Sequence, residues 1–214
     1  MNYFCFNWEL ELLQAIQGLH ASWLSPIMVF VSWINSHGEM WIALGIVLAC
    51  IPKTRKCGFT MLVAMALGAL TADVILKPLI QRARPFQYIT QDGSLQDLFQ
   101  QAQITYQGMI FDIDMVLKET SLPKDFSFPS GHSVCGFAAS VSMFAYYKKA
   151  GFAAICLAAV IAFSRLYLFV HFPTDVIAGI CIGTIYAILA YFIIKPIWKK
   201  LGEKKPEKIE AKEE

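Results

Sequence analysis

Charged residues are scarce in this chain of 214 residues. Lysine, arginine, aspartate and glutamate together make up 16% of it and hydrophobic residues 57%, whereas an ordinary soluble domain is about 25% charged and about 45–50% apolar. The formal net charge is only +2, and no long basic run occurs outside the C-terminal tail, so we expect no nucleic-acid partner. The shortage of charge indicates one integral-membrane domain.

Patterned cysteines and metal-ligand motifs are also missing. The chain has six cysteines but no CxxC pair, and it is not the small secreted chain in which a disulfide framework is expected. We therefore interpret the cysteines as small buried hydrophobic residues. Neither an HExxH motif nor a pair of ligating carboxylates is present, so we expect no metal ion and no other cofactor.

Apolar stretches, separated by short charged segments, run along the whole chain. A helix that spans a bilayer needs about 20 mostly apolar residues, and six stretches are candidates, although the first two are short. The expected fold is therefore all-α, with six transmembrane helices in one domain, residues 1–200, followed by a charged tail, 201–214. The six stretches are Trp23–Ile34, Met40–Ile51, Phe59–Leu76, Ser133–Tyr147, Ala150–Leu168 and Val176–Trp198.

Before the first span, apolar residues recur at helical spacing, with Glu9 and Glu11 off their stripe. This pattern is typical of an amphipathic helix that lies in the membrane interface. A helix packed on the bundle is the alternative. The stripe consists of Trp8, Leu12, Ile16 and Leu19.

Basic residues gather after the second, fourth and sixth stretches, in segments that begin with Lys53, Lys148 and Lys195. With six spans these segments share one side of the cell membrane, which the positive-inside rule makes cytoplasmic, together with both termini. The extracytoplasmic side then receives the long loop 86–128, either a lid over a lipid headgroup or a variable connector. A short surface helix is expected around residues 95–99 of this loop.

Three polar groups interrupt the apolar pattern, all on the extracytoplasmic side. The first ends the third span with Lys77, Arg82 and Arg84. Lys77 and Arg84 each precede a proline, which disfavours the α conformation, so a short turn between two cations is expected. Such cations suit phosphate oxygens, but they also suit a helix end at the interface. Asp73 lies inside the span, where an unpaired carboxylate is costly, so we expect it to pair with Lys77 or Arg82.

The second group, Phe128-Pro-Ser-Gly-His132, opens the fourth span. Ser130 suits a helix N-cap. Gly131 allows the backbone to approach a ligand, and the amides at a helix N-terminus favour an anion. His132 has a side chain that can act as a general acid near neutral pH. A capped helix start with an incidental histidine is the alternative.

The third group, Ser164-Arg165, His171 and Asp175, occupies the turn between the fifth and sixth spans. Asp175 is a candidate N-cap, and its carboxylate can reach one ring nitrogen of His171, which leaves the other nitrogen for attack. Arg165 adds a third cation. Three cations suit a phosphate dianion and its transition state, so the pattern indicates metal-independent phosphate chemistry.

Together the three groups resemble the signature of the type 2 phosphatidic acid phosphatase superfamily. Its parts, Lys-x6-Arg-Pro, Pro-Ser-Gly-His and Ser-Arg-x5-His-x3-Asp, are matched at every position between Lys77 and Asp175. The resemblance implies a membrane lipid phosphatase that works through a phosphohistidine. Soluble haloperoxidases of the superfamily hold vanadate with the same residues, so vanadate is expected to inhibit this protein.

The resemblance also implies a role for each residue. His171 would be the nucleophile, Asp175 would orient it, and His132 would protonate the leaving oxygen and activate the hydrolytic water. Arg82, our own addition, is expected to contact a second phosphate or the headgroup. The phosphate ligands would be Lys77, Arg84, Arg165, Ser130 and the amide of Gly131.

The expected function is metal-independent dephosphorylation of a membrane lipid. Undecaprenyl diphosphate, phosphatidylglycerophosphate and phosphatidate are the candidate substrates, and the expected partners are this lipid and the bilayer; no oligomeric state is predicted. One alternative is a lipid phosphotransferase that uses the same phosphohistidine. The other is a non-catalytic lipid transporter, for which intramembrane charges alone would suffice, but binding needs cations and not two histidines.

Overall fold

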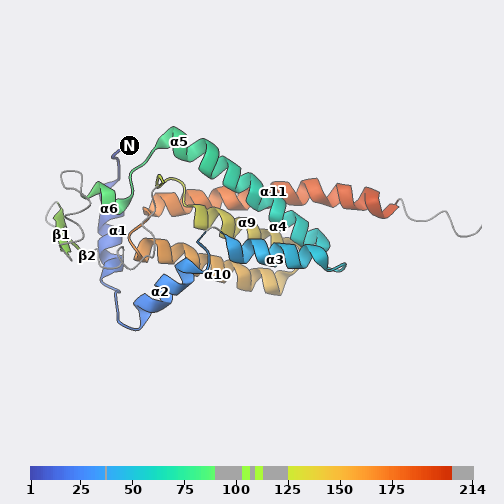
Figure 1. The fold of residues 1–214 in the computed structure, drawn as a ribbon, viewed down its shortest axis with the longest axis horizontal. Coiled ribbons are helices and arrows are strands. Elements are labelled where there is room, and N and C mark those ends of the chain that lie inside the picture. The colour runs from blue at the N-terminus through green and yellow to red at the C-terminus, as the bar shows by residue number, and fades with distance from the viewer. Residues whose placement is uncertain (37, 90–102, 107–108, 113–124, 204–214) are drawn as a thin grey trace, which may run out of the picture.

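The computed structural model is a bundle of helices, and it describes residues 1–36, 38–89, 103–106, 109–112 and 125–203 (Figure 1). The expected surface helix around residues 95–99 lies outside these ranges, as does the tail beyond residue 203. The helices are α1 (Asn7–Gln17), α2 (Leu24–Trp33), α3 (Glu39–Cys50), α4 (Arg55–Ala69), the π-helix η1 (Leu70–Leu76), α5 (Lys77–Ile80), α6 (Pro85–Tyr88), α9 (Gly131–Tyr146), α10 (Lys148–Tyr167) and α11 (Pro173–Glu203).

Two short strands depart from the expected all-α fold. Strands β1 (Gln103–Tyr106) and β2 (Met109–Asp112) form an antiparallel pair in which Gln103 lies opposite Asp112. They belong to the long segment 86–128, most of which lies outside the described residues, so its interpretation as a lid stays a prediction.

Three helical segments are long and apolar enough to cross a membrane: Arg55–Ile80, Lys148–Tyr167 and Pro173–Lys200. Leu24–Trp33 and Glu39–Cys50 are apolar but shorter. A helix rises about 1.5 Å per residue, so ten residues extend for about half of the hydrocarbon core. The protein is therefore a membrane protein with membrane-length apolar helices.

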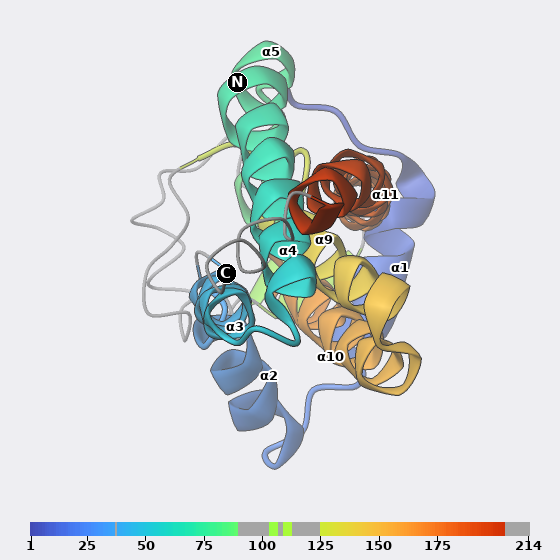
Figure 2. The ribbon, with the colours of Figure 1, turned by 90° about the vertical axis from the view of Figure 1, so that its right-hand side faces the viewer.

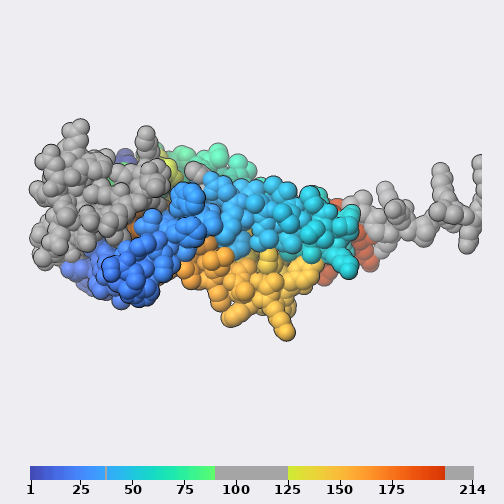
Figure 3. Space-filling model, turned by 60° about the horizontal axis from the view of Figure 1, so that its bottom comes forward, coloured from blue at the N-terminus to red at the C-terminus, as the bar shows by residue number. Residues whose placement is uncertain are grey.

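The expected first span does not run the length of the bundle. Near its start, Ser25 Oγ lies 2.8 Å from the hydroxyl of Tyr167, and near its end Ser32 accepts a hydrogen bond from Arg165. Both partners lie in the last turn of α10, so α2 stays at one end. Figure 3 shows α2 in blue continuing into α3, which follows the bundle. Three helical segments of the described residues have membrane length, and the expected six crossings stay a prediction, because α2 is short and lies at one end.

The N-terminal residues and the end of α11 lie at opposite ends of the bundle (Figure 1). The amide of Asn2 donates to Gln81 O (2.7 Å) just beyond α5, whereas the ring of Trp198 near the end of α11 lies 5.4 Å from that of Phe59 in α4. The expected placement of both termini on one side does not match these described ends, because five helices run lengthwise between them: α3, α4 with its extension, α9, α10 and α11. Which end of the bundle is cytoplasmic stays a prediction.

The basic segments do meet at one end, as expected. The hydroxyl of Tyr147 donates to Lys53 O (3.0 Å), which joins the loop after α3 to the start of α10. The contact between Trp198 and Phe59 brings the end of α11 to the same place. The second and third polar groups lie at the opposite ends of these helices, at the start of α9 and around the end of α10, and thus away from the basic end.

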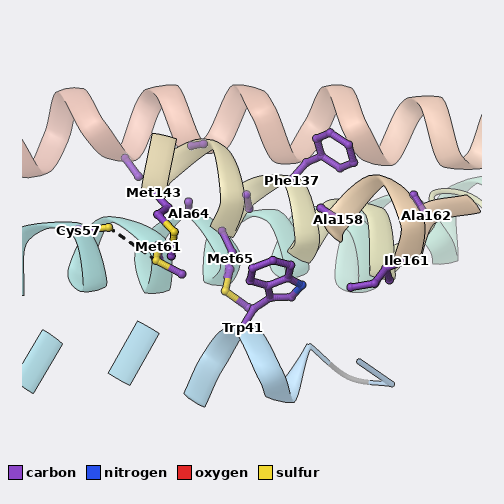
Figure 4. Packing of buried hydrophobic residues seen from close by; sticks show 14 of the residues in the cluster. Trp41, Cys57, Met61, Ala64, Met65, Phe137, Met143, Ala158, Ile161 and Ala162 are labelled. Carbon is purple, nitrogen blue, oxygen red and sulfur yellow. Dashed lines mark hydrogen bonds between the residues drawn. The ribbon is translucent and has the colours of Figure 1, made fainter. Parts of the chain in front are cut away.

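Helix α9 is the centre of the packing, with α4, α10 and α11 around it (Figure 2). Figure 4 shows Trp41 of α3, Met61 of α4, Phe137 of α9 and Ile161 of α10 in one buried cluster. Small residues allow close approach of membrane helices. At Gly183 of α11 a Cβ atom would lie only 2.4 Å from the backbone oxygen of α9 that it faces.

Helix α1 packs on the bundle, which was the alternative to a helix in the membrane interface. Leu10, Leu13 and Ile16 belong to a second buried cluster that also contains Phe169 and Phe172 of the turn after α10. The predicted stripe faces the core only through Ile16, because Trp8, Leu12 and Leu19 are exposed. Glu9, which was placed off the stripe, is completely buried.

We predict that Gly183→Ala destabilises the bundle by about 1–3 kcal/mol, since the added methyl group overpacks two helix backbones that cannot move apart cheaply. Thermal unfolding in detergent measures the change. Ile185→Ala is the matched control on the same helix, because Ile185 is 54% exposed, and it should shift stability by less than about 0.5 kcal/mol. Equal shifts for the two variants would contradict the close approach of α9 and α11.

Candidate functional site

The first polar group begins inside a helix. A break was expected at Lys77, because this residue precedes a proline, but the helix continues through it. Lys77 is helical (φ −59°, ψ −50°) although it precedes Pro78. Proline has no N–H for the carbonyl four residues earlier, and the wider π turn of η1 directly before it accommodates this loss. The helix ends at Gln81, whose φ of 52° is left-handed. Arg84 is extended, as expected before a proline.

The predicted ion pair of Asp73 is present, with its Oδ1 2.7 Å from Lys77 Nζ. Lys77 also donates to Asp125, a residue that the sequence did not single out. Arg84 Nη2 lies 2.6 Å from Asp125 Oδ1, and Arg84 Nε donates to Asp125 O (3.0 Å). Burial alone would raise the pKa of the Asp125 carboxyl, but Arg84 and Lys77 hold it well below its usual range.

The Asp125 carboxylate therefore lies as an anion between the two cations predicted to bind phosphate. Its side chain is half exposed, whereas Lys77 and Arg84 are buried. A phosphate that binds to both cations must displace this carboxylate. No local sequence pattern predicts that Asp125 pairs with these cations, because it lies three residues before the second motif and 41 residues after Arg84.

The start of α9 lies beside the first group. At Gly131 a Cβ atom would be 3.9 Å from both Asp73 Oδ1 and Lys77 Nζ. Ser130 is the N-cap, as predicted, but its hydroxyl does not cap the helix. The hydroxyl instead accepts a hydrogen bond from Ser133 Oγ (3.1 Å), and the Ser130 amide donates to Asp175 O (3.0 Å). The second and third groups are thus joined through the backbone.

His132 presents a ring nitrogen for proton transfer. Its Nε2 is buried and has no hydrogen-bond partner within the described ranges, and the ring forms a hydrogen bond with the Ser32 backbone. The Ser32 hydroxyl accepts from Arg165 Nη1. Helix α2 thus supports both His132 and Arg165, which the sequence did not predict.

The two ring nitrogens of His171 have different surroundings. Nε2 lies 3.2 Å from Arg84 Nη1, and since a guanidinium only donates, Nε2 is the acceptor and the proton resides on Nδ1. Nδ1 faces Asp175 Oδ2 at 3.6 Å and Ser127 Oγ at 3.4 Å. The Ser127 hydroxyl donates to Asp175 Oδ2. This tautomer leaves a lone pair on Nε2.

The environment also keeps His171 uncharged. Burial lowers the pKa of its imidazole well below the ordinary value of 6.5, and the nearby charges of Arg84, Arg165 and Lys77 lower the pKa further. The ring is therefore neutral at pH 7. Only the neutral ring has a lone pair for nucleophilic attack.

Arg82 does not occupy the headgroup position expected for it. Its guanidinium is 1% exposed, and it donates to Asp175 Oδ1 and Glu9 Oε2, each at 2.6 Å. Asp175 is the third residue of α11 and not its N-cap, and its Oδ2 accepts from the Phe172 amide (2.8 Å). Glu9 was missed, although an acidic third residue of a helix is a recognised capping signal.

Comparison with known proteins gives a consistent picture. The model of the PAP2 superfamily matches residues 58–199. An undecaprenyl-diphosphatase of Sulfolobus acidocaldarius is 25% identical over 86% of this chain and 77% of its own length, and the undecaprenyl-diphosphatase BcrC of Bacillus subtilis is 26% identical over 85% and 81%. A transmembrane PAP2-type phosphatidylglycerolphosphate phosphatase of Bacillus subtilis has a similar fold (TM-score 0.58, 23% identity, 94% and 90% covered).

We predict that Asp125→Asn strengthens inhibition by vanadate, because the variant loses the carboxylate that competes with an anion for Lys77 and Arg84. The inhibition constant of purified protein measures the effect. Asp125→Glu keeps the charge and is the matched control. Weaker inhibition of the Asn variant would mean that Asp125 holds the cations in place and does not compete with the ligand.

Proposed function

This chain belongs to the PAP2 superfamily and is a lipid phosphatase, and we propose that it hydrolyses a polyprenyl diphosphate through a phosphohistidine at His171. The observation that carries the mechanism is the contact between His171 Nε2 and Arg84 Nη1 at 3.2 Å. A phosphate held by Arg84 has its phosphorus near this nitrogen. The neutral ring with its proton on Nδ1 suits attack from Nε2.

In the first step Nε2 of His171 forms a bond to the terminal phosphorus, and the bond from phosphorus to the leaving oxygen breaks. His132, which must be protonated while the phosphate is bound, supplies the proton for that oxygen. The positive charge that develops on the His171 ring is stabilised by Asp175 through Nδ1. Lys77, Arg84 and Arg165 stabilise the phosphoryl oxygens.

In the second step a water molecule attacks the same phosphorus. His132, now deprotonated, takes the proton of the water, and the bond between phosphorus and Nε2 breaks. Inorganic phosphate leaves, and the resting protonation states of His132 and His171 are restored. The protein's own cations carry out the charge stabilisation throughout.

The names of the two relatives described above support a diphosphate substrate, since each is an undecaprenyl-diphosphatase. Arg82 lends no support to a second phosphate site, because it already forms ion pairs with Glu9 and Asp175. Orientation follows from the basic end, which the positive-inside rule favours on the cytoplasmic side. The site and Asn2 are then extracytoplasmic.

We predict that His171→Ala abolishes a phosphorylated enzyme intermediate and lowers turnover by about a thousandfold or more. Substrate labelled at the terminal phosphate, quenched rapidly without acid, traps the labelled intermediate. A protein-bound label that is lost in acid but stable in base identifies phosphohistidine. His20→Ala is the matched control, because the His20 ring contacts Tyr167, which has no role in the proposed chemistry. Turnover that persists in His171→Ala would reject the mechanism.

We also predict a preference among lipids. Purified protein in detergent should release phosphate from undecaprenyl diphosphate with a higher kcat/KM than from phosphatidylglycerophosphate, phosphatidate or a water-soluble phosphate ester. Phosphate should appear without any acceptor alcohol, since water completes the reaction. A requirement for an acceptor would indicate a phosphotransferase, and a different preferred lipid would reassign the substrate.

A further inference from the structure

Arg82 lies between two buried carboxylates. Its Nη2 is 2.6 Å from Glu9 Oε2 and its Nη1 is 2.6 Å from Asp175 Oδ1, while the side chains of both acids are 0% exposed. Buried charges persist only when they are paired and hydrogen-bonded. One guanidinium therefore serves two carboxylates, and one of these carboxylates faces His171.

Both acids are the third residues of their helices. Glu9 Oε2 accepts from the amide of Phe6 before α1 (2.9 Å), and Asp175 Oδ2 accepts from the amide of Phe172 before α11 (2.8 Å). Each carboxylate thus satisfies an amide that has no partner within its helix. Arg82 joins the N-termini of α1 and α11 through these two acids.

Thr174 forms hydrogen bonds with both Arg82 and Glu9. Its hydroxyl accepts from Arg82 Nη1 (2.6 Å) and donates to Glu9 Oε1 (2.6 Å), and its amide also donates to Glu9 Oε1 (3.2 Å). With Phe6 N and Arg82 Nη2, the Glu9 carboxylate has four donors. It is fully satisfied and cannot rotate without losing several of them.

Two aromatic rings also contact the guanidinium. The ring of Phe172 lies 4.1 Å from Arg82 Cζ and that of Phe4 lies 4.8 Å away, and Arg82 Nε donates to Phe4 O (3.2 Å). Such stacking adds to the hydrogen bonds. Arg82 therefore has one position, and that position fixes Asp175 Oδ1.

We infer that Glu9 is a positioning residue of the phosphatase site, acting through Arg82 and Asp175 on His171; this rests on the proposed role of His171 as nucleophile. With Glu9 in place, the charge of Arg82 is shared between two acids, and Asp175 keeps enough negative charge to stabilise the phosphorylated ring. Without the Glu9 charge, Arg82 faces Asp175 alone, draws it away from Nδ1 and offsets its charge. Helix α1 is thus part of the active site, although the family match begins only at residue 58.

The test compares Glu9→Gln with Glu11→Gln, a matched control because Glu11 is exposed on the same helix. We expect Glu9→Gln to lower kcat by about tenfold to a hundredfold, as for residues that support metal ligands through a hydrogen bond. KM should stay within about threefold, because the phosphate ligands are untouched. Glu11→Gln should match the unchanged protein in both constants, and equal kcat values for the two variants would overturn the inference.

The tautomer of His171 gives a second measurement that a purely structural role would not move. The chain has four histidines, so nitrogen NMR of protein with labelled histidine is simple to assign, with His171→Ala identifying the signal. The unchanged protein should show a proton on Nδ1 alone. Folded Glu9→Gln should show both tautomers, and an unaltered signal would overturn the inference.

Thr174→Val keeps all charges and removes only the hydroxyl that links Glu9 to Arg82, so it serves if Glu9→Gln does not fold. It should lower kcat several-fold with little change in KM. If both variants aggregate, Glu9 acts in folding and the inference is wrong. If His171→Ala retains turnover, the proposed mechanism itself fails. If His171→Ala is inactive but Glu9→Gln is fully active, only the role of Glu9 is rejected.

Discussion

One buried guanidinium, that of Arg82, holds the catalytic end of the molecule together. A buried charge must be paired, and the partners of Arg82 come from residues 9 and 175, near opposite ends of the sequence. This requirement fixes where the N-terminal segment, the chain after α5 and the start of α11 meet. It also fixes the Asp175 carboxylate beside His171. Folding of this end and alignment of the chemistry thus depend on the same ion pairs.

The bundle keeps its polar residues at its two ends. The long helices expose apolar residues along their length, and the polar residues gather at the two ends because charges are costly within the bilayer. One end collects the basic loops around Lys53, and the other collects the cations of the site. A substrate with an apolar tail and a phosphate headgroup matches this division: under the proposed mechanism its tail would remain in lipid while its phosphate would reach Lys77 and Arg84.

The sequence was most informative where a residue's role is local. The motifs around Lys77, Ser130 and His171 were found from spacing, and the structure brings them together. The failures involve residues whose surroundings are set by distant parts of the chain. Glu9 looked like a solvent-facing acid because its partner, Arg82, lies 73 residues later. Asp125 had no motif of its own, and α2 has the composition of a span but not its length.

The position of Asn2 has a practical consequence for anyone who wishes to attach a reporter. Its amide donates to Gln81 O, and its carbonyl accepts from the amide of Ala83 (3.0 Å), so the second residue is built into the backbone next to Arg82. A fluorescent domain joined ahead of it would pull on the segment that carries the site. The same domain joined beyond α11 would be attached at the far end, and would leave the chemistry undisturbed.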